Sequence, residues 1–133
     1  MYRFITAFLF LVVATVSALA QSLPVPSFWK NQRGSYMNLY STDAQGNFTG
    51  VYMNNAEGFK CRYSPLNPPY KVTGQAHGAN VRFTVVWNNG VENCNSTTVW
   101  SGRMVGQTMP TSWVLYRPGN QPLYGSDVFQ QLP

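Results

Sequence analysis

Short apolar segments alternate with polar turn residues along most of the chain. From Phe28 onward, stretches rich in Tyr, Phe, Trp, Val and Thr recur, and each is bounded by Gly, Asn, Asp or Pro. This pattern is typical of half-buried β-strands, and no window carries a sustained helical period of apolar residues. The pattern predicts eight strands, at residues 28–32, 35–42, 47–54, 70–76, 81–88, 96–105, 111–117 and 127–131.

Compact turns are expected between several of these strands. Residues 42–46, 77–80 and 105–108 each place a Gly beside polar residues, between two apolar runs. Such segments favour tight hairpins, so consecutive strands are expected to pair as an antiparallel meander. Strands of this kind bury one face only if the sheet folds over or closes, and closure removes both edges. We predict an all-β fold, an eight-stranded antiparallel up-and-down β-barrel.

The first twenty residues differ from the rest of the chain. Arg3 is followed by an apolar run from Phe4 to Ala14 and then by Ala18-Leu19-Ala20. This order is typical of a cleaved signal peptide, and a membrane anchor is the alternative. We therefore predict a signal peptide over residues 1–20, an extended leader over 21–27 and one barrel domain over 28–133. The mature protein is expected to be secreted, into the periplasm or the extracellular medium.

Two cysteines lie in the longer connections between predicted strands. Cys61 falls in residues 55–69 and Cys94 in residues 89–95. Both connections open at the same end of an up-and-down barrel. In an exported chain the two residues are candidates for one disulfide rather than for metal ligands, and two unpaired buried thiols are the alternative. A disulfide would tie the long loop across the mouth of the barrel.

The composition narrows the possible functions. The 133 residues include 9 Lys plus Arg, 4 Asp plus Glu and one His. Acid–base, nucleophilic and metal chemistry needs clustered ionisable groups, so no enzyme, catalytic residue, metal site or cofactor is expected. The basic residues are dispersed singly, which argues against a nucleic-acid partner and is most simply explained by solubility. No membrane partner is expected either.

Three tryptophans on adjacent predicted strands suggest a ligand site. Trp87, Trp100 and Trp113 can line one wall, although filling the core is the usual role of Trp. A barrel of about eight strands has room for one small ligand. A cavity lined by indoles and a few polar groups would suit a neutral polar heterocycle. The candidate polar residues lie at strand ends or at alternating positions, and they are Asn31, Ser35, Tyr52, Asn54, Ser96, Thr98 and Asp127.

The order of these residues resembles the avidin/streptavidin family. The resemblance covers nearly all of residues 28–129 and implies a non-catalytic protein that binds biotin with high affinity at one open end of the barrel. A lipocalin-like carrier of another small apolar ligand is the alternative function. Six segments carry the resemblance, namely 31–35 (NQRGS), 49–52 (TGVY), 83–87 (FTVVW), 95–102 (NSTTVWSG), 111–115 (TSWVL) and 125–129 (GSDVF).

The resemblance implies a role for each polar residue at the base of the site. Asn31, Ser35 and Tyr52 would donate hydrogen bonds to the ureido oxygen of biotin. Asp127 would accept a hydrogen bond from one ureido N–H, and the side-chain oxygen of Asn54 would accept one from the other. If Asp127 stays ionised in that site, its bond to the ligand is charge-assisted and strong.

The resemblance also implies what surrounds the rest of biotin. Thr98 would approach the thioether sulfur. Ser96 and the backbone near Ala56 would meet the carboxylate at the rim. The bicyclic rings and the valeryl chain would be enclosed by Trp87, Trp100, Trp113 and Leu115.

One segment departs from the pattern of the family's tetramers. These carry a further Trp that crosses a subunit interface shortly before the last strand, whereas residues 118–124 contain no Trp. The cysteines and residues 91–96 are instead similar to a disulfide-bearing, dimeric, rhizavidin-like bacterial branch of the family. In that branch, a bridged loop lowers the ordering cost of binding. The resemblance implies a homodimer, with a tetramer or larger assembly as the alternative.

Overall fold

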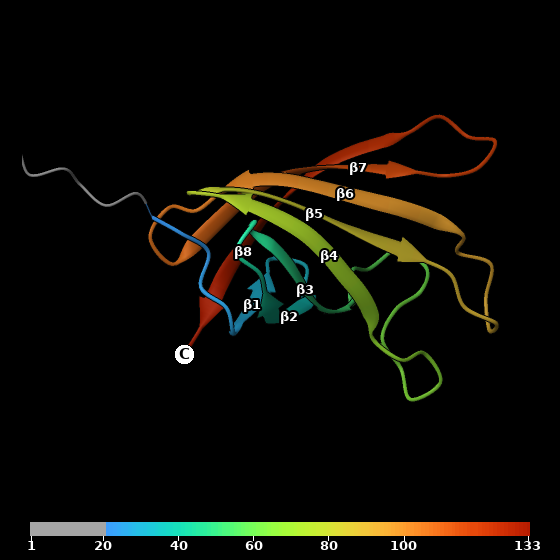
Figure 1. Ribbon diagram of the computed structural model, residues 1–133. Helices are drawn as coiled ribbons and strands as arrows, with labels where there is room; N and C mark the ends of the chain where they lie inside the picture. Colours follow the sequence, from blue (N-terminus) through green and yellow to red (C-terminus); the bar gives the residue numbers. More distant parts are fainter. Residues whose placement is uncertain (1–20) are drawn as a thin grey trace, which may run out of the picture.

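The chain forms a closed antiparallel barrel in the computed structural model, which describes residues 21–133 (Figure 1). The predicted signal peptide, residues 1–20, lies outside the described residues. The strands follow one another around the barrel in sequence order. They are β1 (Ser27–Asn31), β2 (Tyr36–Thr42), β3 (Asn47–Met53), β4 (Tyr70–His77), β5 (Asn80–Trp87), β6 (Ser96–Arg103), β7 (Thr108–Tyr116) and β8 (Leu123–Leu132).

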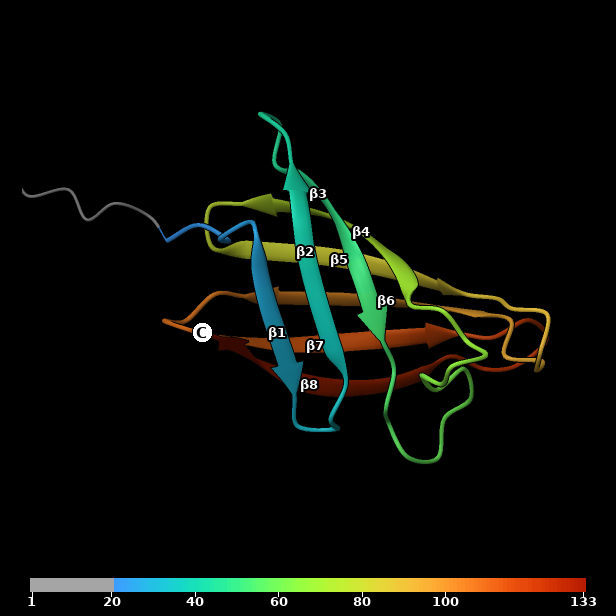
Figure 2. The ribbon, with the colours of Figure 1, turned by 90° about the horizontal axis from the view of Figure 1, so that it is seen from below.

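Pairing between the first and last strands closes the barrel. β1 pairs with β2 on one side and with β8 on the other, from Phe28 opposite Leu132 to Asn31 opposite Phe129. In Figure 2, β1 to β3 cross the strands of the opposite wall at a steep angle, as the strand tilt of a small barrel requires. The predicted eight-stranded up-and-down β-barrel is confirmed.

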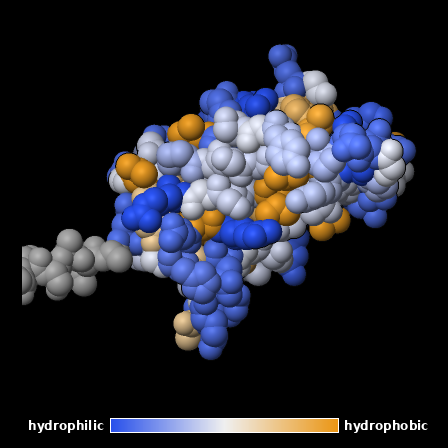
Figure 3. All heavy atoms as spheres, turned by 90° about the horizontal axis from the view of Figure 1, so that it is seen from above, coloured by the Kyte–Doolittle hydropathy of each residue, from blue (hydrophilic) through white to orange (hydrophobic). Residues whose placement is uncertain are grey.

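Alternate residues of each strand point into the barrel. β5 shows this most clearly, since Val81, Phe83, Val85 and Trp87 are buried and the residues between them are not. The inward side chains of one half of the barrel form a solid apolar core that includes Met37, Leu39, Phe83, Met109 and Phe129, each at most 1% exposed. On the outer face seen in Figure 3, hydrophobic residues form several separate patches among hydrophilic ones.

Two strands, β7 and β8, begin three and four residues earlier than the sequence pattern predicts. β8 starts at Leu123 rather than at Asp127, so Asp127 lies within the strand and does not begin it. Gly125 does not break the strand, because the ring of Trp113 fills the space where its side chain would be. β7 starts at Thr108 and includes Pro110. Pairing of β7 with β6 begins only at Thr111, the residue after this proline. The missing N–H of Pro110 therefore removes no bond to β6.

The two ends of the barrel differ. At one end lie the three short turns predicted from the sequence, and Gly46, Gly78 and Gly106 adopt the positive φ angles that these turns require. Residues 21–26 pack at this end, where Gln21 exchanges two hydrogen bonds with Gly106 and where Leu23 contacts the core. The other end carries the β1–β2, β3–β4, β5–β6 and β7–β8 connections.

Among residues 21–133, no helix is long and apolar enough to cross a membrane.

Candidate ligand-binding site

A cavity of about 600 Å³ opens at the end of the barrel that carries the longer connections. Every predicted site residue except Asn31 and Ser35 lines it, and those two are buried directly behind Tyr52 and Asn54. The cavity occupies the half of the barrel that the apolar core leaves open. The predicted residues along its wall are Tyr52, Asn54, Ala56, Trp87, Ser96, Thr98, Trp100, Trp113, Leu115 and Asp127.

Three indoles from β5, β6 and β7 form the aromatic wall of the cavity. Trp100 stacks on Phe83 of the core, with ring centroids 5.0 Å apart and planes inclined by 14°. Trp87 donates its indole N–H to Thr98 Oγ1 at 2.8 Å, and Trp100 donates its own to Asp127 Oδ2 at 2.9 Å. Since these N–H groups are satisfied, the ring orientations are set before any ligand arrives.

The β1–β2 turn places Asn31 at the base of the cavity. Asn31 Oδ1 accepts the backbone N–H groups of Arg33 and Ser35, both at 3.0 Å. Gly34 makes this tight turn possible with a φ of +82°. The Asn31 amide nitrogen donates to the Tyr52 hydroxyl oxygen at 3.2 Å. Each amide nitrogen carries two hydrogens, so one remains for a ligand.

Tyr52 is placed to act as a hydrogen-bond donor. Burial, and then the nearby Asp127 carboxylate, raise the pKa of the Tyr52 hydroxyl well above its ordinary value, although the neighbouring Ser35 and Asn31 side chains and the Arg33 charge oppose this shift. Both main causes disfavour a phenolate. Tyr52 is therefore protonated at physiological pH. Because its oxygen accepts the Asn31 bond, its proton is free to point into the cavity.

Asn54 holds the start of the β3–β4 loop. Its side-chain oxygen accepts the Ala56 N–H at 3.1 Å and the Ser35 hydroxyl at 3.4 Å, and its nitrogen donates to the Lys60 carbonyl at 3.0 Å. Ser35 Oγ also accepts the Asn55 N–H at 2.9 Å. A ligand N–H bound to the Asn54 oxygen would therefore share an acceptor already in use, and the Ala56 N–H is not free to meet a carboxylate.

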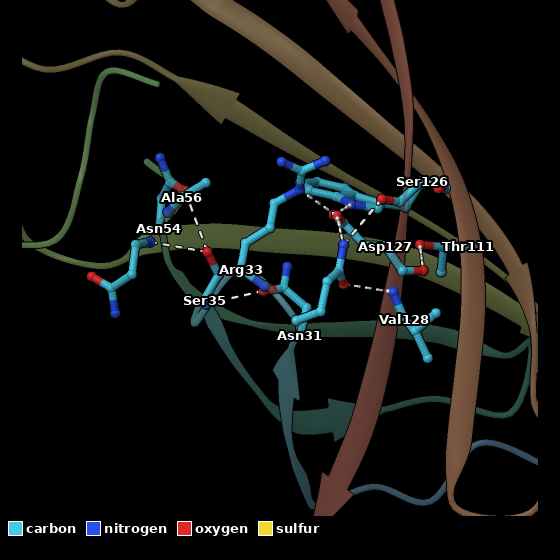
Figure 4. Close-up of polar contacts among 12 residues, drawn as sticks. Asn31, Arg33, Ser35, Asn54, Ala56, Thr111, Ser126, Asp127 and Val128 are labelled. Atoms are coloured by element: carbon cyan, nitrogen blue, oxygen red, sulfur yellow. Dashed lines mark hydrogen bonds and ion pairs between the residues drawn. The ribbon is translucent and has the colours of Figure 1, made fainter. Parts of the chain in front are cut away.

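Asp127 is the buried carboxylate of the site, with 3% of its surface exposed. Its Oδ1 atom accepts hydrogen bonds from Gln32 Nε2 at 3.1 Å and from Arg33 Nε at 2.8 Å (Figure 4). Trp100 donates to the other oxygen. A buried charge is tolerated only when it is paired and hydrogen-bonded, and these three donors meet that requirement.

The predicted disulfide is present and joins two loops at the mouth. Cys61 in the β3–β4 connection and Cys94 in the β5–β6 connection have Cα atoms 5.9 Å apart. Glu92 accepts the Cys61 N–H, and Ser96 donates its hydroxyl to the Cys94 carbonyl at 2.7 Å. Cys61, Glu92 and Cys94 also form a group of potential metal ligands, but the disulfide leaves neither sulfur as a thiolate.

Sequence reasoning missed several residues of the cavity, all in the connections at its mouth or near them. Arg33 lies inside the segment that carries the family resemblance, yet the dispersed charge pattern indicates only a role in solubility for it. Three basic residues that are far apart in the sequence line the same cavity, and they are Arg33, Lys60 and Arg117. No local pattern reveals this, because each comes from a different loop. Other missed residues of the wall are Gly58, Phe59, Asn93, Asn95, Pro118, Asn120 and Leu123.

Gly125→Ala is expected to disturb the Trp113 wall. An added Cβ would lie 2.1 Å from Trp113 Cζ2, so the indole must move. Overpacking of this kind costs about 1–3 kcal/mol of stability. Thermal unfolding should show the loss, and Trp fluorescence should show the displaced ring. Gly90→Ala is the control, because a Cβ there meets nothing within 4 Å. Equal melting temperatures for the two variants would contradict the contact.

The similarity of the chain to known proteins covers all of these elements. The Avidin family model matches residues 20–132, which include every strand. Afifavidin of Afifella pfennigii is 40% identical over 121 residues, which make up 85% of this chain and 73% of that protein. The crystal structure of apo shwanavidin is 41% identical, with a TM-score of 0.76, over 85% of this chain and 100% of that one. The rhizavidin–biotin complex is 41% identical, with a TM-score of 0.70, over 83% and 93% of the two chains.

Proposed function

Because the chain belongs to the avidin family, we propose that it binds biotin, without catalysis, in the cavity at the loop end of its barrel. One observation carries the proposal. A buried carboxylate, Asp127, which accepts three hydrogen bonds and has room for a fourth, lies beside an indole wall at the base of a cavity of about 600 Å³. Rhizavidin, which is similar to this chain over nearly its whole length, is solved in complex with biotin.

The base of the cavity suits a cyclic urea. A urea has one strongly accepting oxygen and two N–H donors, and it carries no net charge. The second Asn31 amide hydrogen and the Tyr52 proton supply donors for the oxygen, and the Ser35 hydroxyl is a third once it leaves Asn54. Asp127 supplies a charge-assisted acceptor for one N–H. The two sides of the urea thus meet groups of opposite polarity.

The walls and the rim suit the rest of biotin. We assign the rings and the valeryl chain to the indoles of Trp87, Trp100 and Trp113 and to Leu115, and the sulfur to the neighbourhood of Thr98. At the rim, Ser96 is assigned to the carboxylate, to which its hydroxyl donates once it leaves the Cys94 carbonyl. Positive charge in the cavity wall, from Lys60 and Arg117, favours an anionic ligand tail there.

Biotin is expected to raise the melting temperature of the protein. A ligand that binds only the native state stabilises it by about 2.7 kcal/mol at 100 times its Kd, which shifts the melting temperature of a small domain by roughly 10 °C or more. Calorimetric scans with and without biotin measure the shift, and octanoate is the control for a carrier of apolar acids. A melting temperature that does not change with saturating biotin, or that rises equally with octanoate, would contradict the proposal.

We further propose that the protein is secreted and forms a homodimer. The signal-peptide pattern of residues 1–20 and the disulfide, which is typical of oxidising compartments, support secretion. Outward-facing apolar side chains on neighbouring strands support a dimer, since Tyr116 of β7 is 51% exposed and Tyr124 and Val128 of β8 are 75% and 49% exposed. Sedimentation equilibrium measures the assembly.

A further inference from the structure

The Arg33 side chain extends from the β1–β2 turn into the cavity and forms an ion pair with the buried carboxylate of Asp127. Arg33 Nε lies 2.8 Å from Asp127 Oδ1, and the side chains are 36% and 4% exposed. Figure 4 shows the Arg33 side chain extending past Asn31 toward Asp127. The cation thus approaches the carboxylate from the open side of the site.

Aromatic rings of the cavity flank the same guanidinium. Arg33 Cζ is 5.8 Å from the ring centroid of Trp113 and 5.9 Å from that of Phe59. Both distances are within the range of cation–π attraction. The guanidinium therefore lies between the carboxylate and an indole wall of the cavity. These are the groups that the proposed function assigns to the ureido ring.

A guanidinium and a urea are close in shape. Each is a planar carbon bearing nitrogen donors, and each can donate N–H bonds to a carboxylate. We infer that Arg33 is an internal ligand of the site, whose guanidinium fills part of the ureido position in the free protein and competes with the ligand for Asp127. This inference rests on the proposed function, and it adds guanidinium groups to the chemistry that the site accepts.

The surrounding structure allows Arg33 to leave. Asp127 keeps two other donors, Gln32 Nε2 at 3.1 Å and Trp100 Nε1 at 2.9 Å, so the carboxylate is not left unpaired. The backbone of Arg33 is held separately, because its N–H donates to Asn31 Oδ1. A rotation of the partly exposed side chain into water is therefore sufficient, and the turn that positions Asn31 and Ser35 stays in place.

Arg33→Ala is expected to bind biotin roughly three- to tenfold more tightly than the unmodified protein, with faster association. The competing ion pair and cation–π contacts are of the partly exposed kind, and their loss corresponds to about that factor. Arg103→Ala is the matched control, since it removes the same charge from the end of β6, outside the cavity. Stopped-flow fluorescence and calorimetry measure both variants.

Equal or weaker binding by Arg33→Ala, or an equal gain in Arg103→Ala, would overturn the inference while leaving biotin binding intact. A second measurement needs no biotin. Methylguanidinium at up to about 50 mM should give a saturable change in the indole N–H NMR signal of Trp100 in Arg33→Ala. The unmodified protein should need a roughly three- to tenfold higher concentration for the same change, and the Arg33→Ala/Asp127→Asn double variant should show none.

The two failures can be told apart. If no form of the protein binds biotin but Arg33→Ala binds methylguanidinium, the proposed function fails and the internal-ligand inference stands. If Arg33→Ala does not respond to methylguanidinium, or if the unmodified protein responds equally, the internal-ligand inference is wrong whatever the biotin result. Methylammonium chloride at equal concentration controls for ionic strength, because it lacks the planar donor group.

Discussion

Asp127→Ala is expected to lower the affinity for biotin by about two to three orders of magnitude. The substitution removes a charge-assisted bond to the ligand, worth about 1.5–3 kcal/mol. When biotin excludes water from the cavity, the Trp100 indole N–H, which donates to Asp127 Oδ2 in the unmodified protein, is also left without a partner. An unsatisfied buried donor costs about 1–3 kcal/mol. Isothermal titration calorimetry or displacement of a bound azo dye measures the loss.

The control for this prediction is Asp43→Asn. Asp43 lies in the β2–β3 turn at the opposite end of the barrel, where it accepts bonds from Gln45 and Asn47. Its neutralisation removes the same charge without touching the cavity, so biotin affinity should not change. Measurement in an Arg33→Ala background separates the ligand bond from the release of Arg33. A loss below about fivefold would mean that Asp127 does not bind the ligand, and it would favour a lipocalin-like carrier.

Cys61→Ser/Cys94→Ser is expected to lower the free energy of unfolding by about 3–4 kcal/mol. The disulfide closes a loop with a sequence separation of 33 residues, and the loss of this constraint enlarges the unfolded ensemble by about that amount. A barrel of this size has a small core, so the loss is a large share of its stability. Urea denaturation followed by Trp fluorescence measures it.

The same variant is expected to release biotin about five- to tenfold faster. Phe59 and Lys60 precede Cys61 in one loop, and Asn93 and Asn95 flank Cys94 in the other. All four residues line the cavity. Without the bridge, the loops must be ordered at the moment of binding. Reduction of the unmodified protein should also lower its stability and speed the release of biotin. The reductant should change neither quantity in the double variant. Unchanged stability and unchanged release after reduction would contradict this role.

Much of the barrel was predictable because its cause is local. In β5, Val81, Phe83 and Val85 alternate with Arg82 and Thr84, and this pattern already specifies a strand with one buried face. The hairpin at Gly78 is equally local, since its backbone needs a residue that tolerates positive φ. The strand boundaries at Gly125 and Pro110 were not predictable, because a neighbouring strand decides whether these residues interrupt a ladder.

The sequence by itself determined the strands, the closed sheet, the cysteine pair at one rim and the residue types gathered at the base of the cavity. Only the tertiary structure decided which groups hold one another there. Arg33 and Asp127 are separated by 94 positions in the chain, and Ser35 of the β1–β2 connection bonds to Asn54 of the β3–β4 connection. The physical reason is that the direction of a loop side chain depends on the partners that barrel closure brings to it. A period along one strand carries no information about those partners.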